Sequence, residues 1–156
     1  MHNPLLMMNL LSAVYWFDEA LQTALKREGW PAITRAQSLL FANLAAGEYR
    51  ASRLARNLGV TRQSISEMLR ELETRGLLTT EADPNDRRAR VVRFSEESEP
   101  LREAARDVLR QLERELKTRI GPEAFGGLIG GLTAEWGAPP DVQAQKPVHP
   151  AGSGSR

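Results

Sequence analysis

The stretch that decides the fold runs from Ser52 to Phe94 and reads SRLARNLGVTRQSISEMLRELETRGLLTTEADPNDRRARVVRF. Ser52 is a residue type that caps helix N-termini, and Gly59 readily adopts the left-handed conformation that ends a helix. Thr61 is a second cap. The apolar residues after it recur at helical spacing until Gly76, at Ile65, Met68, Leu69 and Leu72. The pattern therefore predicts two short helices joined by a tight turn.

Two strand-like runs follow, residues 77–81 and 90–94. Asp83-Pro84-Asn85-Asp86 between them is rich in turn-forming residues. Three arginines come directly after this turn, at positions 87, 88 and 90. A hairpin tip that carries arginines suits insertion into a DNA minor groove or contact with phosphates. We expect Asp86 to hold an arginine in place through a bidentate pair rather than to touch DNA.

The second predicted helix is polar on the face opposite its apolar stripe. This face carries Arg62, Gln63, Ser66, Glu67 and Arg70, whose side chains are long or polar enough to reach phosphates or base edges in a major groove. Glu67 has two interpretations, contact with a cytosine amino group or an ion pair with Arg70 on its own helix, and we favour the ion pair.

Three motifs give this stretch a resemblance to the MarR family of bacterial transcription regulators. They are LAxxLGVTRQxxS at residues 54–66, LExRGLL at 72–78 and DxxDRRA at 83–89. The resemblance extends from the first helix to about residue 136. It implies a mainly α (α+β) fold, a winged helix-turn-helix at about 34–94 with dimerisation helices at about 4–28 and 99–136, in one domain of residues 1–136.

The resemblance also implies a homodimer that binds double-stranded DNA, as a repressor whose two recognition helices enter a palindromic operator. Half-site centres would lie about one helical turn, roughly 10 bp, apart. Thr61 and Ser64 are expected to contact phosphates, and Arg62, Gln63 and Ser66 to contact bases. Arg87 and Arg88 are expected to read the minor groove. The full set of expected DNA-binding residues is Ser52, Thr61, Arg62, Gln63, Ser64, Ser66, Arg70, Arg87, Arg88 and Arg90.

The charge distribution supports this interpretation although the whole chain carries only +1. Residues 50–93 contain ten arginines, no lysine and six carboxylates, a net charge of +4, which leaves −3 for the remainder. Arginine is the cation best suited to phosphate and guanine. A competing hypothesis is a winged helix that binds protein and has no operator of its own; salt-sensitive binding to a palindrome separates the two.

Composition excludes several other classes. The chain has no cysteine, which fits a reducing compartment such as the cytoplasm and rules out thiol redox sensing and zinc–thiolate sites. Its two histidines, His2 and His149, lie near the ends. We find no phosphate-binding glycine loop, nucleophile elbow or metal-ligand cluster, and so expect no enzyme activity, cofactor or metal. The apolar run at 4–17 is too short to cross a bilayer, so no membrane partner is expected.

The predicted terminal helices carry more apolar surface than one core requires. In the first helix, Leu10, Val14, Phe17, Leu21 and Leu25 form one stripe, and Met7, Leu11 and Tyr15 extend it to a second face. We hypothesise that a second subunit covers that face. After the hairpin, Pro100 leaves two choices, a distorted first turn or a helix start near Ser98 or Glu99. Leu101, Ala105, Val108, Leu112 and Leu116 then form the stripe of a long helix.

The last predicted helix, about 123–136, contains four glycines, which favour either close helix contact or fraying. Residues 137–156 are rich in proline, glycine and serine and are expected to be disordered. MarR-like proteins often bind small aromatic acids between the dimerisation helices and the winged domain. The pocket for such an effector would be lined here by Tyr15, Trp16, Trp30 and Phe41. The alternative is that these aromatic residues are ordinary core residues.

Overall fold

The computed structural model describes residues 5–143, except for the side chains of Arg87 and Arg88. The chain is mainly helical with one two-stranded antiparallel sheet, which confirms the predicted fold class. The elements are α1 (Leu6–Arg27), α2 (Arg35–Ala45), α3 (Ala51–Leu58), α4 (Arg62–Thr74), β1 (Leu78–Asp83), β2 (Asp86–Phe94), the 3₁₀ turn η1 (Glu96–Ser98), α5 (Glu99–Ile120) and α6 (Pro122–Thr133).

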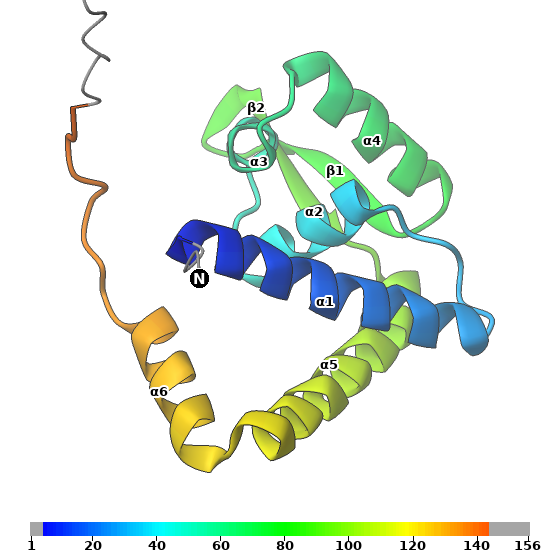
Figure 1. Ribbon diagram of the computed structural model, residues 1–156. Coiled ribbons are helices and arrows are strands. Elements are labelled where there is room, and N and C mark those ends of the chain that lie inside the picture. The colour runs from blue at the N-terminus through cyan, green and yellow to red at the C-terminus, as the bar shows by residue number, and fades with distance from the viewer. Residues whose placement is uncertain (1–4, 144–156) are drawn as a thin grey trace, which may run out of the picture.

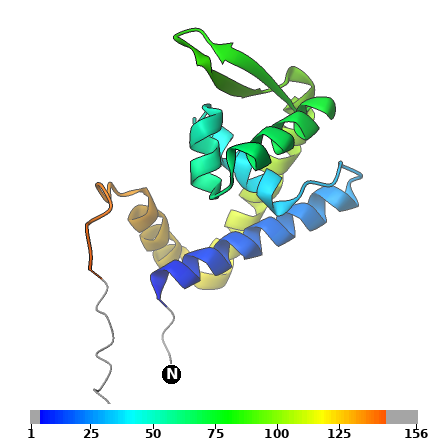
Figure 2. The same cartoon turned by 90° about the horizontal axis from the view of Figure 1, so that it is seen from above.

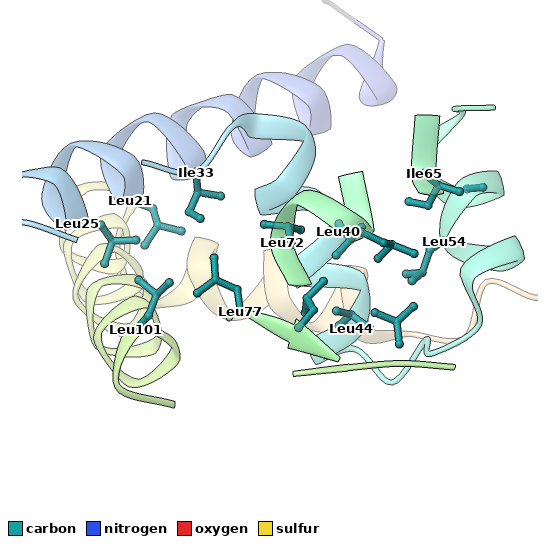
Figure 3. Close-up of a cluster of buried hydrophobic side chains, with 14 residues drawn as sticks. Leu21, Leu25, Ile33, Leu40, Leu44, Leu54, Ile65, Leu72, Leu77 and Leu101 are labelled. Carbon is teal, nitrogen blue, oxygen red and sulfur yellow. The ribbon is translucent and has the colours of Figure 1, made fainter. Parts of the chain in front are cut away.

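The core lies where α2, α3, α4 and the hairpin meet. Leu40, Leu54, Leu72 and Val92, one from each of these elements, are fully buried. Figure 3 shows this cluster continuing through Leu77 toward the C-terminal half of α1 and the start of α5. Each of these short helices buries its one apolar stripe against the others, so the buried side chains form one continuous cluster. This region therefore folds as a unit.

The winged-helix body consists of α2, α3, α4 and the hairpin of β1 and β2. Helix α1 crosses this body and packs against α5, while α6 continues from the far end of α5 (Figure 1). Only the C-terminal half of α1 contributes to the core, through Leu21 and Leu25. Val14, in the same predicted stripe, is exposed because the first half of α1 extends past the body. The hairpin projects on the side away from α6 (Figure 2).

Most of the predicted helix boundaries are confirmed. The Thr34 hydroxyl accepts from the Gln37 N–H at 3.2 Å, and the Gln37 side chain accepts from the Thr34 N–H at 3.0 Å, so these two residues form a capping box at the start of α2. Thr61 caps α4 by accepting from the Ser64 N–H at 3.0 Å. Gly59 and Gly76 adopt φ of 65° and 68°, in the left-handed region that ends α3 and α4.

Helix α2 buries a polar residue and exposes an apolar one. Leu39 is 36% exposed, whereas Gln37 is only 2% exposed. Helical spacing explains this, because residues 37, 40, 41 and 44 share one face of α2 and position 39 lies to one side of it. Gln37 remains polar in the core because both of its amide groups have partners: the oxygen accepts from Thr34, and the nitrogen donates to the Glu71 carboxylate at 3.0 Å.

The hairpin is longer than the predicted strands at 77–81 and 90–94. It spans Leu78–Asp83 and Asp86–Phe94, so Pro84 and Asn85 alone form the turn. Its register steps from Ala82 opposite Arg90 to Asp83 opposite Asp86, which places residues 87–89 in an irregularity of β2. A single antiparallel bridge between Arg50 and Val91 joins the segment before α3 to the hairpin.

The C-terminal helices resolve the ambiguity at Pro100. Ser95 caps the 3₁₀ turn by accepting from the Ser98 N–H at 3.2 Å, and α5 then begins at Glu99 with Pro100 in its first turn. Proline is tolerated there because the backbone N–H it lacks has no helical partner in the first turn. Helix α6 ends at Thr133, three residues before the predicted end at Trp136. Residues 137–143 form no helix or strand, and the rest of the predicted tail, 144–156, lies outside the described residues.

Candidate DNA-binding surface

The helix-turn-helix is formed by α3, the turn at Gly59–Val60, and α4. The Val60 N–H donates to the carbonyl of Ala55 at 3.0 Å, which closes the turn back onto α3. Ala55 is 5% exposed, and its small side chain lets the two helices cross closely. These local features follow directly from the sequence and fix α4 as the outer helix of the pair.

Helix α4 separates its apolar and polar residues onto opposite faces. Ile65, Leu69 and Leu72 are buried, and Met68 is half-buried. All the predicted contact residues of this helix and its cap are exposed to solvent, namely Thr61, Arg62, Gln63, Ser64, Ser66 and Arg70. The structure therefore brings these predicted residues together on one solvent-facing surface, where they are free to meet a ligand as large as DNA.

The hydrogen bonds on this surface leave the cations free. Thr61 and Ser64 join their hydroxyls at 2.8 Å, and Ser66 donates to the Arg62 carbonyl at 2.8 Å. Within the described part of the chain, Arg62 and Arg70 form no ion pair. Because no carboxylate neutralises them, both guanidinium groups present their full charge to solvent.

The predicted pairing of Glu67 with Arg70 is wrong. Glu67 instead accepts from the Gln63 side-chain amide, at 3.0 Å. Residues four apart lie one above the other on a helix, and the neutral amide pairs with the carboxylate without drawing a guanidinium away from solvent. Gln63 consequently keeps its amide oxygen free as an acceptor.

The hairpin supplies the second part of the surface. Arg90 is exposed, and its guanidinium donates to the Thr80 carbonyl at 3.3 Å, which lays this side chain across the hairpin toward β1. The backbone of Arg87 and Arg88 lies at the start of β2, directly after the turn. Their side chains lie outside the described part of the structure, so their predicted DNA contacts, and the predicted role of Asp86, stay predictions.

Ser52 does not have its predicted capping role. Helix α3 begins two residues earlier than a Ser52 cap would place it, at Ala51, with Arg50 as its N-cap residue and no side-chain cap. The chain is extended up to Arg50 because Arg50 bridges to Val91, and it turns into the helix directly after that bridge. Ser52 therefore lies in the first turn of α3, exposed.

One ion pair in this region was not predicted. The Arg50 guanidinium donates to a carboxylate oxygen of Asp83 at 3.0 Å. The other oxygen of Asp83 accepts from the Asn85 N–H at 2.8 Å, as in an Asx turn. The Asp-Pro-Asn sequence signals this turn, but nothing local signals a partner 33 residues away.

The four aromatic residues of the expected effector pocket occupy different surroundings. Trp30 and Phe41 are half-buried against the core, with Phe41 packed on Phe94 at 5.6 Å between ring centroids. The Tyr15 ring lies under the Arg35 guanidinium at 4.4 Å. Trp16 packs edge-on against Phe17 at 4.9 Å and lines a shallow hollow on α1. Among the described residues, none of the four rings packs against another of the four.

The described residues contain neither a cluster of metal-ligand side chains nor a helix that could span a membrane. No three or more histidine, cysteine, aspartate or glutamate side chains in residues 5–143 are grouped as metal ligands would be. Nor does any helix in that range have the length and apolar character needed to span a bilayer.

Comparison with known proteins finds a family model and several solved structures that are similar to this chain. Residues 33–89 match the MarR family model. The fold is also similar to solved structures. The transcriptional regulator PA4135 has 23% identity and a TM-score of 0.67, with 83% of this chain and 94% of that one covered.

Two further structures were solved with bound molecules. A transcriptional repressor, CouR, bound to a 23-mer DNA duplex, has 24% identity and a TM-score of 0.62, covering 82% of this chain and 89% of that one. NadR in complex with 4-hydroxyphenylacetate has 20% identity and a TM-score of 0.66, covering 85% and 92%.

The family match and the candidate surface concern the same part of the chain. The matched residues contain the complete helix-turn-helix and the turn of the hairpin, the same elements that form the exposed polar surface. Residues 33–89 are therefore similar to the MarR family over the helix-turn-helix and the first part of the hairpin.

Proposed function

We propose that the chain is a homodimeric repressor that binds a palindromic operator through α4 and the hairpin. The observation that carries this proposal is the exposed polar face of α4, where Arg62 and Arg70 are unneutralised, beside a projecting hairpin with three arginines. A helix presented in this way fits a major groove, and a basic hairpin next to it fits the flanking backbone and minor groove.

The dimer is supported by apolar surface that the protomer leaves exposed. Leu5, Leu6, Met7, Met8 and Leu11 are between 46% and 78% exposed at the start of α1, and Leu128, Ile129, Leu132 and Trp136 are between 41% and 63% exposed in and after α6. Both groups lie at the end of the molecule away from the hairpin (Figure 2). A second copy that covers them would leave both α4 helices free to face DNA.

Selection of bound sequences from a random duplex pool tests the operator. The proposal predicts enrichment of an inverted repeat with half-site centres roughly 10 bp apart. Light scattering of the purified complex should give two chains per duplex. Enrichment of no sequence, together with salt-insensitive binding to a protein partner, would instead support a protein-interaction module.

Substitution of the hairpin arginines tests whether the hairpin, the wing of the winged helix, contacts DNA. Arg87→Ala combined with Arg88→Ala should weaken binding to all sequences by a similar factor. It should also lower the slope of log affinity against log salt by roughly one for each phosphate contact removed. A matched control is Arg110→Ala, which removes an arginine ion-paired with Asp107 on α5, away from the hairpin. An unchanged affinity and slope in the hairpin variant would contradict the proposed wing contact.

An aromatic acid is the proposed effector class, supported by the likeness to NadR and by cations beside two of the predicted residues. Arg35 lies over Tyr15, and Arg119 lies 6.0 Å from the Trp16 ring centroid. A guanidinium beside an aromatic ring suits a ligand that combines a ring with a carboxylate. A thermal-shift screen of aromatic carboxylates, including 4-hydroxyphenylacetate, should find a stabilising compound that also releases DNA. A screen without any stabilising compound would count against the effector.

A further inference from the structure

Asp83 is a buried carboxylate at the outer end of the hairpin. Its side chain is 5% exposed, and each of its oxygens has a partner, the Asn85 N–H on one side and the Arg50 guanidinium on the other. A buried carboxylate that lost its cation would carry an uncompensated charge, which is strongly unfavourable. The pair therefore ties the shape of the turn to the first residue before α3.

Two attachments hold the hairpin against the body at this edge. The first is backbone: the Val92 N–H donates to the Tyr49 carbonyl at 2.8 Å, beside the bridge between Arg50 and Val91. The second is the Arg50–Asp83 pair. The register places Val91 opposite Glu81, so the ion pair attaches the hairpin two residues farther toward its turn than the bridge does.

The remaining contacts of Arg50 indicate that its side chain serves the hairpin rather than its own helix. At the N-cap position a short polar side chain would accept from the first turn of α3, and Arg50 has no acceptor to offer. Its backbone N–H donates to the Glu48 carboxylate at 3.0 Å. The guanidinium is left to reach across to β1, where it meets Asp83.

We propose that Arg50 is a positioning residue for DNA binding: through Asp83 it sets the angle of the hairpin, and so the reach of Arg87 and Arg88 toward DNA. This inference rests on the proposed wing contact. The Arg50 side chain is 51% exposed, so direct contact of Arg50 with a phosphate is the competing explanation. The two explanations differ in whether the effect of Arg50 depends on the hairpin arginines.

A double-mutant cycle separates them. Affinity for a selected operator would be measured for the wild type, Arg50→Ala, the Arg87→Ala/Arg88→Ala variant, and all three substitutions together. A positioning role predicts that Arg50→Ala weakens binding roughly tenfold when the hairpin arginines are present and has almost no further effect when they are absent. A direct phosphate contact predicts the same loss in both backgrounds, which would overturn the proposal.

Asp83→Asn supplies an independent test from the other partner. Asparagine keeps an oxygen that accepts from the Asn85 N–H, so the turn is preserved while the charge that holds Arg50 is removed. This variant should reproduce the loss seen with Arg50→Ala, and combining the two should add little. Wild-type binding by Asp83→Asn, with the folded state verified by circular dichroism, would overturn the proposal.

Arg53→Ala is the matched control on the same helix. Arg53 is 66% exposed and pairs with Glu48 at 3.8 Å, so it does not touch the hairpin carboxylate. Any loss from Arg53→Ala should be equal in the presence and absence of Arg87 and Arg88. Failure of the proposed wing contact has its own signature, because the Arg87→Ala/Arg88→Ala variant would then bind as the wild type does. Weakened binding by that variant with unchanged binding by Arg50→Ala would defeat the positioning role alone.

Discussion

The winged-helix body and the terminal helices use apolar residues in opposite ways. In the body, each short helix buries its stripe, and residues such as Leu40, Leu54 and Leu72 have no exposed surface. The start of α1 and all of α6 are as apolar in sequence, yet no residue of α6 is buried, and Met7 is 78% exposed. A run of apolar residues in the sequence therefore shows which surface needs to be buried, but the packing of the protomer decides whether that surface is covered.

Core truncation gives the largest expected difference between the two regions. Leu54→Ala should lower the free energy of unfolding by about 2–5 kcal/mol, because it leaves a cavity in a fully buried site. Leu132→Ala removes the same atoms from a side chain that is 45% exposed. In a dimer its effect should depend on protein concentration, since it acts on association. Urea unfolding at several protein concentrations measures both. Equal, concentration-independent losses would remove the distinction between the regions.

A charge on the exposed face of α1 gives the next largest effect. Leu11→Glu should dissociate the proposed dimer. Operator binding should then weaken at least tenfold, about 1.4 kcal/mol, because a single subunit contacts only one half-site. The winged-helix body should remain folded, because Leu11 is 46% exposed in the protomer. Sedimentation velocity reports the change. Thr23→Glu, on the exposed side of the same helix, is the control, and dissociation by both variants or by neither would contradict the assignment of this face.

Within the body, two residues were predicted to cap helices of the helix-turn-helix, Thr61 and Ser52, and their substitutions should differ in their effect on stability. Thr61→Ala should cost about 1 kcal/mol, because it removes the acceptor for the Ser64 N–H. Ser52→Ala should change stability by less than about 0.5 kcal/mol, since Ser52 caps nothing in the structure. Thermal unfolding of the two variants decides the point. A larger loss from Ser52→Ala would mean that α3 begins where the sequence pattern placed it.

The smallest predicted effect lies at the junction of the body with α5. A hydrogen bond from Arg106, with the charge of Arg102 beside it, lowers the pKa of Glu99 below its ordinary value. A lowered pKa means that the folded state favours the carboxylate, so this stabilisation is present at neutral pH and is lost as acid protonates the group. Glu99→Gln should therefore reduce the melting temperature slightly at pH 7, and the reduction should disappear in acid. Glu103→Gln, on the same helix, is the control, and a reduction that persists unchanged in acid would contradict this assignment.

Much of the fold was predictable because its signals are local. The capping box of Thr34 and Gln37, the cap at Thr61 and the left-handed glycines at 59 and 76 each depend on residues within one turn of helix. The polar face of α4 follows from the same helical periodicity. These features locate the helix-turn-helix without knowledge of what packs around it.

Several features that were not predictable have a different cause, which is contact between residues far apart in the sequence. Ser52 does not cap α3 because the bridge of Arg50 to β2 places the start of the helix before it. Gln37 can be buried because its side-chain amide donates a hydrogen bond to Glu71 of α4. The Arg50–Asp83 pair joins residues from two elements that only the folded chain brings together. The candidate site was thus predictable in its exposed residues but not in the contacts that hold its two parts in register.

The most direct test of the central claim is an anisotropy titration of the purified protein against duplex DNA from the region upstream of its own gene. The titration would be run at two salt concentrations with excess non-specific competitor. We expect a competitor-resistant complex of one dimer per site whose affinity falls as salt rises, and which Arg62→Ala weakens. Operator recognition by α4 and the hairpin would be contradicted if the non-specific competitor abolished binding at both salt concentrations, both for this region and for any duplex enriched from a random pool.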